Sequence, residues 1–128
     1  MQKVVSDARF SSDSAGAALT YTVALGDIGG AAKQVMIMAV IKQSSGANVR
    51  LFLQLLHSPN NFIFTKHSDL VGTAGTPVAI NTDNLMVGDS DAAVMLGDYL
   101  NLAFTINDSA ASSEQWVVVD IYVSAKPF

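Results

Sequence analysis

The sequence has no cysteine and few charged residues, and each shortage excludes classes of function. Without cysteine the chain has no disulfide bond, no thiol nucleophile and no thiolate metal site. Charged residues make up 14% of the chain, against about 25% in typical soluble domains. The seven Lys and Arg residues are scattered singly, and the net charge is −4. A basic surface for a phosphate backbone is therefore missing, and we expect neither nucleic acid nor a membrane as a partner.

Long hydrophobic runs are also missing. The N-terminal segment MQKVVSDARF lacks the apolar core of roughly 7–15 residues that a secretory signal needs. No run approaches the roughly 18–20 apolar residues that span a bilayer. We therefore expect no signal peptide and no membrane-spanning segment.

The dominant pattern in the sequence is alternation of apolar and polar residues, interrupted by clusters of Gly, Asn, Asp, Ser and Pro. Alternation predicts half-buried strands, and the turn-forming clusters end them. The apolar sets that we expect to share a face are Leu19, Tyr21, Val23, Leu25; Val49, Leu51, Leu53, Leu55; Leu100, Leu102, Phe104, Ile106; and Val117, Val119, Ile121, Val123. We count eight to ten strands and expect residues 67–77 to form a loop.

No repeat or linker divides these strands, so we predict one domain over residues 1–128. Its expected fold is all-β, an antiparallel two-sheet β-sandwich of the jelly-roll or a related Greek-key type. The last two strands leave the topology open. Their apolar sets pair in register as a simple hairpin, with Ile106 beside Val117, whereas a jelly roll places these strands in opposite sheets. We favour the jelly roll.

One strand has two apolar faces. In VMIMAVI, residues 35–41, the odd positions suit the core, while the even positions Met36, Met38 and Val40 are apolar too. Two further strands repeat this pattern, and exposed apolar patches of that size mark interaction surfaces. The residues that we predict to form an oligomer interface are Met36, Met38, Val40, Phe52, Leu56, Trp116, Val118 and Tyr122. We expect the partner to be another copy of the chain, in a closed ring such as a trimer; the alternative is that segment 66–80 covers this face.

Candidate catalytic residues are few. His57-Ser58 and His67-Ser68-Asp69 suggest a triad, but consecutive residues on an extended chain cannot point their side chains at one another. We therefore expect His57 at the surface and residues 67–69 in a polar loop. A cupin metal site needs two or more histidines in a metal-ligating pattern, and His57 and His67 lie at a spacing and in contexts unlike that pattern. Glu114 is the single glutamate available for a carboxylate pair. We predict no enzymatic activity and no cofactor.

Aspartates are concentrated in the second half of the chain, at Asp83, Asp89, Asp91 and Asp98. Loops of this composition sometimes bind calcium, which takes six to eight oxygen ligands. The spacing does not match an EF-hand loop, and aspartate is common in turns. We interpret these residues as solvated turn carboxylates, and the pattern leaves open whether Asp83, Asp89 and Asp91 bind calcium.

The whole chain resembles the small single jelly rolls of viral and bacteriophage capsid and capsid-decorating proteins. The segments that carry the resemblance are RFSSDSAGAALTYTVAL, LGDYLNLAFTIN and SEQWVVVDIYVSAKPF. It rests on the strand pattern, so no functional residue carries over. The resemblance implies a structural protein of the virion that is made in the host cytoplasm. It also implies a capsid shell protein as a second partner. A basic arm for the genome is missing, which favours a decoration or accessory role; the alternative is a carbohydrate- or receptor-binding module.

Overall fold

The computed structural model describes residues 2–14, 17–27, 34–46, 49–73, 78–80, 85–91, 95–107 and 113–126. Within these ranges the chain forms nine strands: β1 (Gln2–Ser11), β2 (Leu19–Asp27), β3 (Gln34–Ser44), β4 (Arg50–Ser58), β5 (Thr65–Val71), β6 (Val78–Ala79), β7 (Leu85–Asp89), β8 (Tyr99–Asn107) and β9 (Trp116–Lys126). The described residues include no helix, and accordingly no helix long and apolar enough to cross a bilayer.

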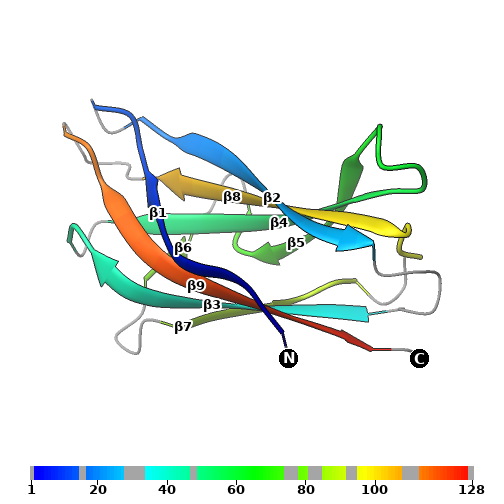
Figure 1. The fold of residues 1–128 in the computed structure, drawn as a ribbon. Coiled ribbons are helices and arrows are strands. Elements are labelled where there is room, and N and C mark those ends of the chain that lie inside the picture. Colours follow the sequence, from blue (N-terminus) through cyan, green and yellow to red (C-terminus); the bar gives the residue numbers. More distant parts are fainter. Residues whose placement is uncertain are drawn as a thin grey trace.

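The strands form two antiparallel sheets packed face to face (Figure 1). Sheet 1 has the order β1-β9-β3-β7, and sheet 2 has the order β2-β8-β4-β5, with β6 paired to the start of β4. Consecutive strands alternate between the sheets at both ends of the chain, and β8 and β9 lie in opposite sheets. This is a jelly roll, as predicted. The alternative hairpin does not form, because β8 pairs with β2 and β4 while β9 pairs with β1 and β3.

The core lies between the sheets and is formed by the alternating apolar residues of the central strands. Every predicted inward residue of β4, β8 and the first half of β9 is buried, and so is the odd face of β3. On the edge strand β2 the prediction holds less well: Tyr21, Val23 and Leu25 are only partly buried and Leu19 is exposed. An edge strand has a neighbour on one side, so its apolar face is covered from one side only.

The prediction of a loop at 67–77 is wrong for residues 67–71, which belong to β5 and pair with β4. The alternation is hidden because the pairing register shifts twice, with Leu70 and His67 as the extra residues. Each bulge puts two neighbouring residues against one partner residue and breaks the two-residue period. His67 and Ser68 are therefore buried rather than part of a polar loop.

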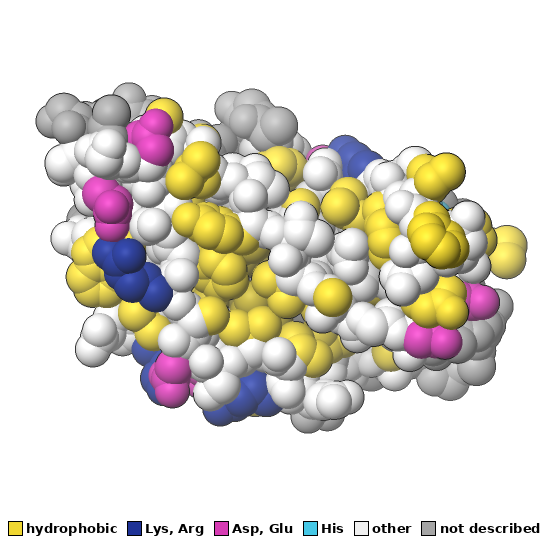
Figure 2. Space-filling view, turned by 45° about the horizontal axis from the view of Figure 1, so that its top comes forward, with side chains coloured by type: hydrophobic (Ala, Val, Ile, Leu, Met, Phe, Trp, Pro, Cys, Tyr) yellow, Lys and Arg dark blue, Asp and Glu magenta, His cyan; other side chains and the backbone are white. Residues whose placement is uncertain are grey.

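The two edges of the sandwich are closed differently. At one edge β5 packs closely on β7, because Gly88 leaves room for the Leu70 backbone: a Cβ on Gly88 would lie 2.2 Å from the Leu70 carbonyl oxygen. At the other edge β1 and β2 are linked by the Tyr21 hydroxyl, which donates to the Ser11 carbonyl oxygen at 2.7 Å. Figure 2 brings the β2 side forward and shows a band of hydrophobic atoms across its middle, with the charged side chains nearer the margins.

Candidate functional site

The outer face of sheet 1 carries six of the eight predicted interface residues, and we call it the β3–β9 face. Its outward apolar side chains are Met36, Met38 and Val40 from β3, Trp116, Val118 and Tyr122 from β9, and Leu85 and Val87 from β7. The register puts Met38 directly between Tyr122 and Val87. Val87 keeps 49% of its surface exposed, and the β3 residues are half-buried. The structure thus gathers residues from three strands into one apolar surface.

The remaining two predicted residues lie elsewhere. Phe52 and Leu56 are on the outer face of sheet 2, where Phe52 is opposite Thr105 and Leu56 is opposite Lys66. Phe52 keeps only 9% of its surface exposed, so most of it is already covered within its own chain. The eight residues therefore do not form one continuous surface.

Segment 66–80 does not cover the β3–β9 face in its described part. Residues 66–71 lie in β5 and residues 78–79 form β6, and both strands pair with β4 in sheet 2. Residues 74–77 lie outside the described residues. The alternative of cover by this segment is therefore wrong for every part of it that the structure describes.

A buried carboxylate lies within the β3–β9 face, and the sequence analysis did not identify it. Asp120 keeps 6% of its surface exposed, although it points outward from β9. The Asp7 backbone N–H donates to its Oδ1 at 2.8 Å, and Lys3 Nζ lies 3.3 Å from its Oδ2. Lys42 Nζ lies 3.8 Å from the same oxygen and pairs with the Asp7 carboxylate. Two cations and two anions thus form a neutral cluster, the Asp120 cluster, within the β3–β9 face.

The backbone and the charges explain the ionisation of the Asp120 cluster. Asp7 has a φ of +52°, a left-handed conformation that aspartate tolerates, and it lies where the pairing of β1 with β9 is irregular. The Asp7 N–H and then Lys3 hold the pKa of Asp120 below its usual value, against the opposite effect of burial. The hydrogen bond to Asp120 raises the pKa of Lys3, and the pairing with Asp7 raises that of Lys42. These shifts favour the charged forms of Asp120, Lys3 and Lys42 at neutral pH.

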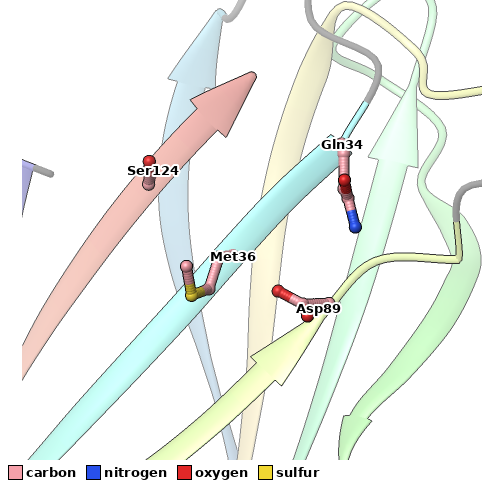
Figure 3. Close-up of a pocket in the computed structure, with 4 residues that line it drawn as sticks. All are labelled: Gln34, Met36, Asp89 and Ser124. Carbon is pink, nitrogen blue, oxygen red and sulfur yellow. The ribbon is translucent and has the colours of Figure 1, made fainter. Parts of the chain in front are cut away.

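A small pocket lies at one end of the β3–β9 face. It has a volume of about 130 Å³ and is lined by Gln34, Met36, Asp89 and Ser124. Figure 3 shows Met36 between Ser124 on β9 and Asp89 on β7, with Gln34 further along β3. Pockets for drug-sized ligands have roughly 300–1,000 Å³, so this depression suits a few water molecules or one protruding side chain.

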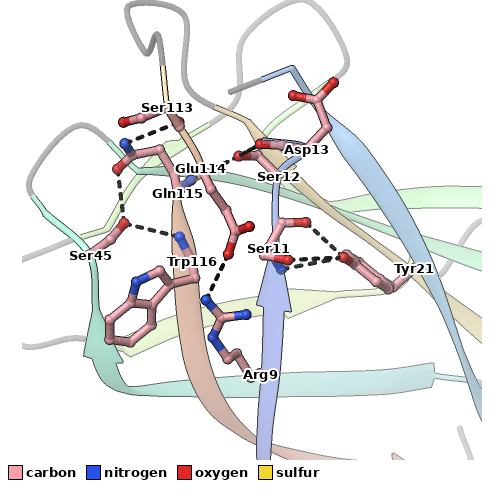
Figure 4. A network of polar contacts seen from close by, with 10 residues as sticks. All are labelled: Arg9, Ser11, Ser12, Asp13, Tyr21, Ser45, Ser113, Glu114, Gln115 and Trp116. Carbon is pink, nitrogen blue, oxygen red and sulfur yellow. Dashed lines mark hydrogen bonds and ion pairs between the residues drawn. The ribbon is translucent and has the colours of Figure 1, made fainter. Parts of the chain in front are cut away.

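The other end of the face is fixed by a polar network at the start of β9 (Figure 4). The Trp116 backbone N–H donates to Ser45 Oγ at 3.0 Å, and the Gln115 N–H donates to Ser12 Oγ at 2.8 Å. These bonds tie β9 to the ends of β3 and β1. Arg9 donates to Glu114 at 2.7 Å, and its guanidinium lies 5.4 Å from the Trp116 ring centroid.

Both large aromatic side chains of the β3–β9 face contact a cation. Lys3 Nζ lies 5.5 Å from the Tyr122 ring centroid, just as Arg9 lies over Trp116. Sugars stack on open ring faces, so a cation over each ring removes one such face. This arrangement disfavours these two rings as a carbohydrate platform.

The two histidines, which the sequence analysis treated separately, are in contact. Their ring centroids are 4.9 Å apart in an edge-to-face arrangement, on the neighbouring strands β4 and β5. His57 is half-buried, not fully at the surface as predicted, and its Nδ1 accepts from the Gly97 N–H at 3.0 Å. Burial, and then the charge of His67, lower the pKa of His57. The Nδ1 of His67 is hydrogen-bonded to Ser68 Oγ at 2.9 Å.

No group of three or more His, Asp or Glu side chains in the described part of the chain is placed to hold a metal ion. Of the aspartates considered for calcium, Asp89 lines the small pocket and Asp91 is exposed. Asp83 lies outside the described residues. The interpretation of these aspartates as solvated carboxylates stays a prediction.

Comparisons with known proteins place the fold among β-sandwiches of viruses and of sugar-binding modules. No protein-family model matches the sequence, and no curated protein matches it significantly. The structure is similar to the VP2 subviral particle of infectious bursal disease virus, with a TM-score of 0.58 and 14% identity over 98% of this chain and 32% of that chain. VP2 of the Gx strain of this virus is similar at a TM-score of 0.53 and 17% identity, over 94% of this chain and 31% of that chain.

A sugar-binding protein, the C-terminal domain of EclA, is similar at a TM-score of 0.53 and 13% identity, over 94% of this chain and 79% of that chain. This chain spans about a third of the length of the VP2 chains and most of the EclA domain. At these identities the likeness shows the fold alone: an all-β sandwich of the jelly-roll kind.

Proposed function

We propose that this chain is a non-enzymatic structural protein of a virus particle, with a capsid-decorating or accessory role, and that it self-associates through the β3–β9 face. The observation that carries the proposal is the apolar surface that β3, β9 and β7 form together. The likeness to VP2, a protein that forms subviral particles, supports the location in a virion. A capsid shell protein is the second partner that this role implies.

The energetics favour a covered β3–β9 face. Fully burying a side chain such as Met or Val contributes roughly 1.5–3 kcal/mol, and Met36, Met38 and Val40 are each only half-buried in the single chain. A closed ring, of which a trimer is the simplest candidate, covers the same patch on every copy and leaves no sticky end.

The Asp120 cluster is compatible with such an interface. A buried charge destabilises an interface when it has no partner, but Asp120 already has the Asp7 N–H and two lysines around it. The cluster therefore brings no unpaired charge into the contact.

The test is the mass of the assembly, measured by analytical ultracentrifugation of the wild type and of Met38→Asp. Burying an unpaired carboxylate in the contact costs several kcal/mol, so we expect Met38→Asp to lose the contact through the β3–β9 face and to sediment as a folded protein of lower mass than the wild type. Thr105→Asp is the matched control, because it adds the same charge to the outer face of sheet 2, and it should leave the ring intact. A monomeric wild type at micromolar concentration, together with unfolding of Met38→Asp, would show that the face packs within its own chain.

A second function, sugar binding, is favoured by one observation besides the likeness to EclA. Phe62 in the β4–β5 connection is 87% exposed, and its backbone N–H donates to Asn60 Oδ1 at 3.0 Å. The Ile63 N–H bonds the same oxygen, so the backbone of the loop is held in place beneath an open aromatic ring. A glycan array distinguishes the two functions: binding that Phe62→Ala abolishes supports the sugar module, and a negative array supports the structural protein.

A further inference from the structure

The edge strands of the sandwich differ in how well they are protected against pairing with another chain. β1 carries Lys3, Asp7 and Arg9 and has two register irregularities. β7 has only five residues, and β5 has two register shifts. Short strands, charges and bulges are the devices by which proteins block unwanted pairing at sheet edges.

β2 lacks these devices over most of its length. From Leu19 to Gly26 it contains no charged residue and no proline, and its pairing with β8 is uninterrupted from Leu19 to Ala24. Within the described residues the backbone of β2 pairs with the strand β8 alone, so from Leu19 to Ala24 its other side has no neighbouring strand. A long, uncharged, regular edge of this kind is a template for another strand.

The core is also incomplete at this edge. Tyr21, Val23 and Leu25 from β2 and Val5 and Ala8 from β1 pack on the core but stay partly exposed. The band of hydrophobic atoms on the β2 side of the molecule fits this finding (Figure 2). A strand added next to β2 would place its own inward side chains over this band.

We infer that the free edge of β2 pairs antiparallel with β2 of a second copy. The two-fold axis passes between Thr22 and Thr22 of the second copy. This contact joins sheet 2 of both copies into one continuous sheet. It is separate from the β3–β9 face, and it adds a second contact to the proposed self-association.

The register follows from two constraints. Directly opposite residues in an antiparallel pair point to the same side of the sheet. A two-fold axis must therefore place one residue opposite the same residue of the other copy. Centring it on Thr22 uses the regular stretch before the bulge at Leu25 and pairs Thr20 with Ala24 and Tyr21 with Val23 of the other copy. Threonine opposite threonine is a favourable cross-strand pair, and like charges do not face each other in this register.

A second copy fits this edge better than a foreign strand because the edge is self-complementary. Its outward residues are small and its inward residues are apolar, so the two-fold pairing places small residues opposite small residues and apolar residues opposite apolar residues. The same patch on both subunits defines an isologous two-fold contact. Where its axis meets the axis of the ring, a two-fold contact together with the ring builds a closed, higher-order assembly, which suits a particle protein.

Cysteine cross-linking tests the pairing directly, because the chain has no cysteine of its own. Opposite residues of an antiparallel pair have Cα atoms about 4.5–5.5 Å apart, within the range of about 4.4–6.8 Å that a disulfide needs. Under mild oxidation we expect Thr22→Cys to form covalent dimers in most of the protein. Asn101→Cys is the matched control, since it lies on the outer face of the same sheet, one strand in from the edge. If Thr22→Cys cross-links no more than Asn101→Cys does, the inference is wrong. A foreign strand on the edge would give this result, because it would keep the two cysteines apart.

A charge variant separates this contact from the β3–β9 face. Thr22 is exposed, so Thr22→Lys keeps the fold, and its two lysines repel each other across the axis. We expect it to reduce the assembly to the ring alone, while Asn101→Lys changes nothing; an unchanged mass for Thr22→Lys would contradict the inference. In a Met38→Asp background, Thr22→Cys should still cross-link. If Met38→Asp leaves the wild-type mass unchanged while Thr22→Cys cross-links, the ring is wrong and the edge contact holds.

Discussion

On the outer face of sheet 1, Met38 lies between an aromatic and an aliphatic side chain, Tyr122 and Val87. On the outer face of sheet 2, by contrast, Thr20 Oγ1 and Thr105 Oγ1 are hydrogen-bonded at 2.8 Å. The inner faces of the central strands of both sheets are apolar and buried. The two sheets therefore differ in what they present outward and hardly in what they contribute to the core.

The polar groups of the two outer faces are also organised differently. On sheet 2 the exposed Lys66 and the partly buried Gln54 both contact Asp69, at 3.0 Å and 3.2 Å. On sheet 1 two lysines and the Asp7 N–H surround the buried Asp120. This difference is why the proposed contact is assigned to the outer face of sheet 1.

The largest expected effect comes from placing a charge on the buried inner face of either sheet. Ile37 in β3 and Leu102 in β8 are both fully buried. A carboxylate at either position would have no partner in the core, and its burial costs a large part of a stability of about 5–15 kcal/mol. We expect Ile37→Asp and Leu102→Asp each to abolish folding, measured by far-ultraviolet circular dichroism and solubility. A folded Ile37→Asp protein would mean that the inner face of β3 is not the core.

The fold could be predicted because the four central strands have a clear sequence pattern. β3, β4, β8 and β9 each have a neighbour on both sides and a sheet opposite, so their period-two pattern appears directly in the sequence. The jelly roll was favoured over the hairpin by the choice of fold class, since the pairing pattern of 100–107 with 117–123 suits either. The edge strand β5 was missed because bulges at His67 and Leu70 erase its alternation.

The site could be predicted in part. The apolar even face of β3 is visible in the sequence as VMIMAVI, and the neighbouring residues Trp116, Val118 and Tyr122 were found by the same parity argument. The Asp120 cluster was not, because Asp7, Lys3 and Lys42 come from strands far apart in the sequence. One signal was available: Asp120 is a single charge within the apolar stretch WVVVDIYV. The contact of His57 with His67 depends on β5 and was missed with it.

The next effect in size concerns the Asp120 cluster. Asp120→Leu removes the acceptor of the Asp7 N–H and the partner of Lys3, so we expect a lower midpoint of chemical unfolding. Because the folded-state pKa of Asp120 is lowered, its stabilisation is present above the ordinary pKa of about 3.9 and is lost as the pH falls below it. The wild type should therefore lose more stability on acidification than Asp120→Asn does. Equal acid sensitivity of the two proteins would show that the carboxylate charge has no structural role.

A smaller effect concerns the histidine contact in sheet 2. The folded-state pKa of His57 is lowered, so the unfolded chain binds the proton more readily, and stability falls as the pH drops below about 6.5. His57→Asn offers an acceptor near the position of Nδ1 for the Gly97 N–H but does not titrate in this range. We expect unfolding midpoints measured from about pH 8 down to pH 5 to decline less in His57→Asn than in the wild type. The same slope in both proteins would exclude His57 as the titrating group.

The smallest effect tests the outer face of sheet 2. Thr20→Val removes one partner of the threonine pair that links β2 and β8, and such cross-strand pairs contribute roughly 0.2–1 kcal/mol. The site is exposed, so water replaces the lost hydrogen bond, and the double variant Thr20→Val/Thr105→Val should be as stable as either single variant to within experimental error. Chemical unfolding of the four proteins gives the coupling energy of the pair directly. Exposed hydrogen bonds contribute less than about 2 kcal/mol, so a larger loss of stability would mean that the outer face of sheet 2 is itself covered in the folded protein. The contrast between the two outer faces would then be wrong.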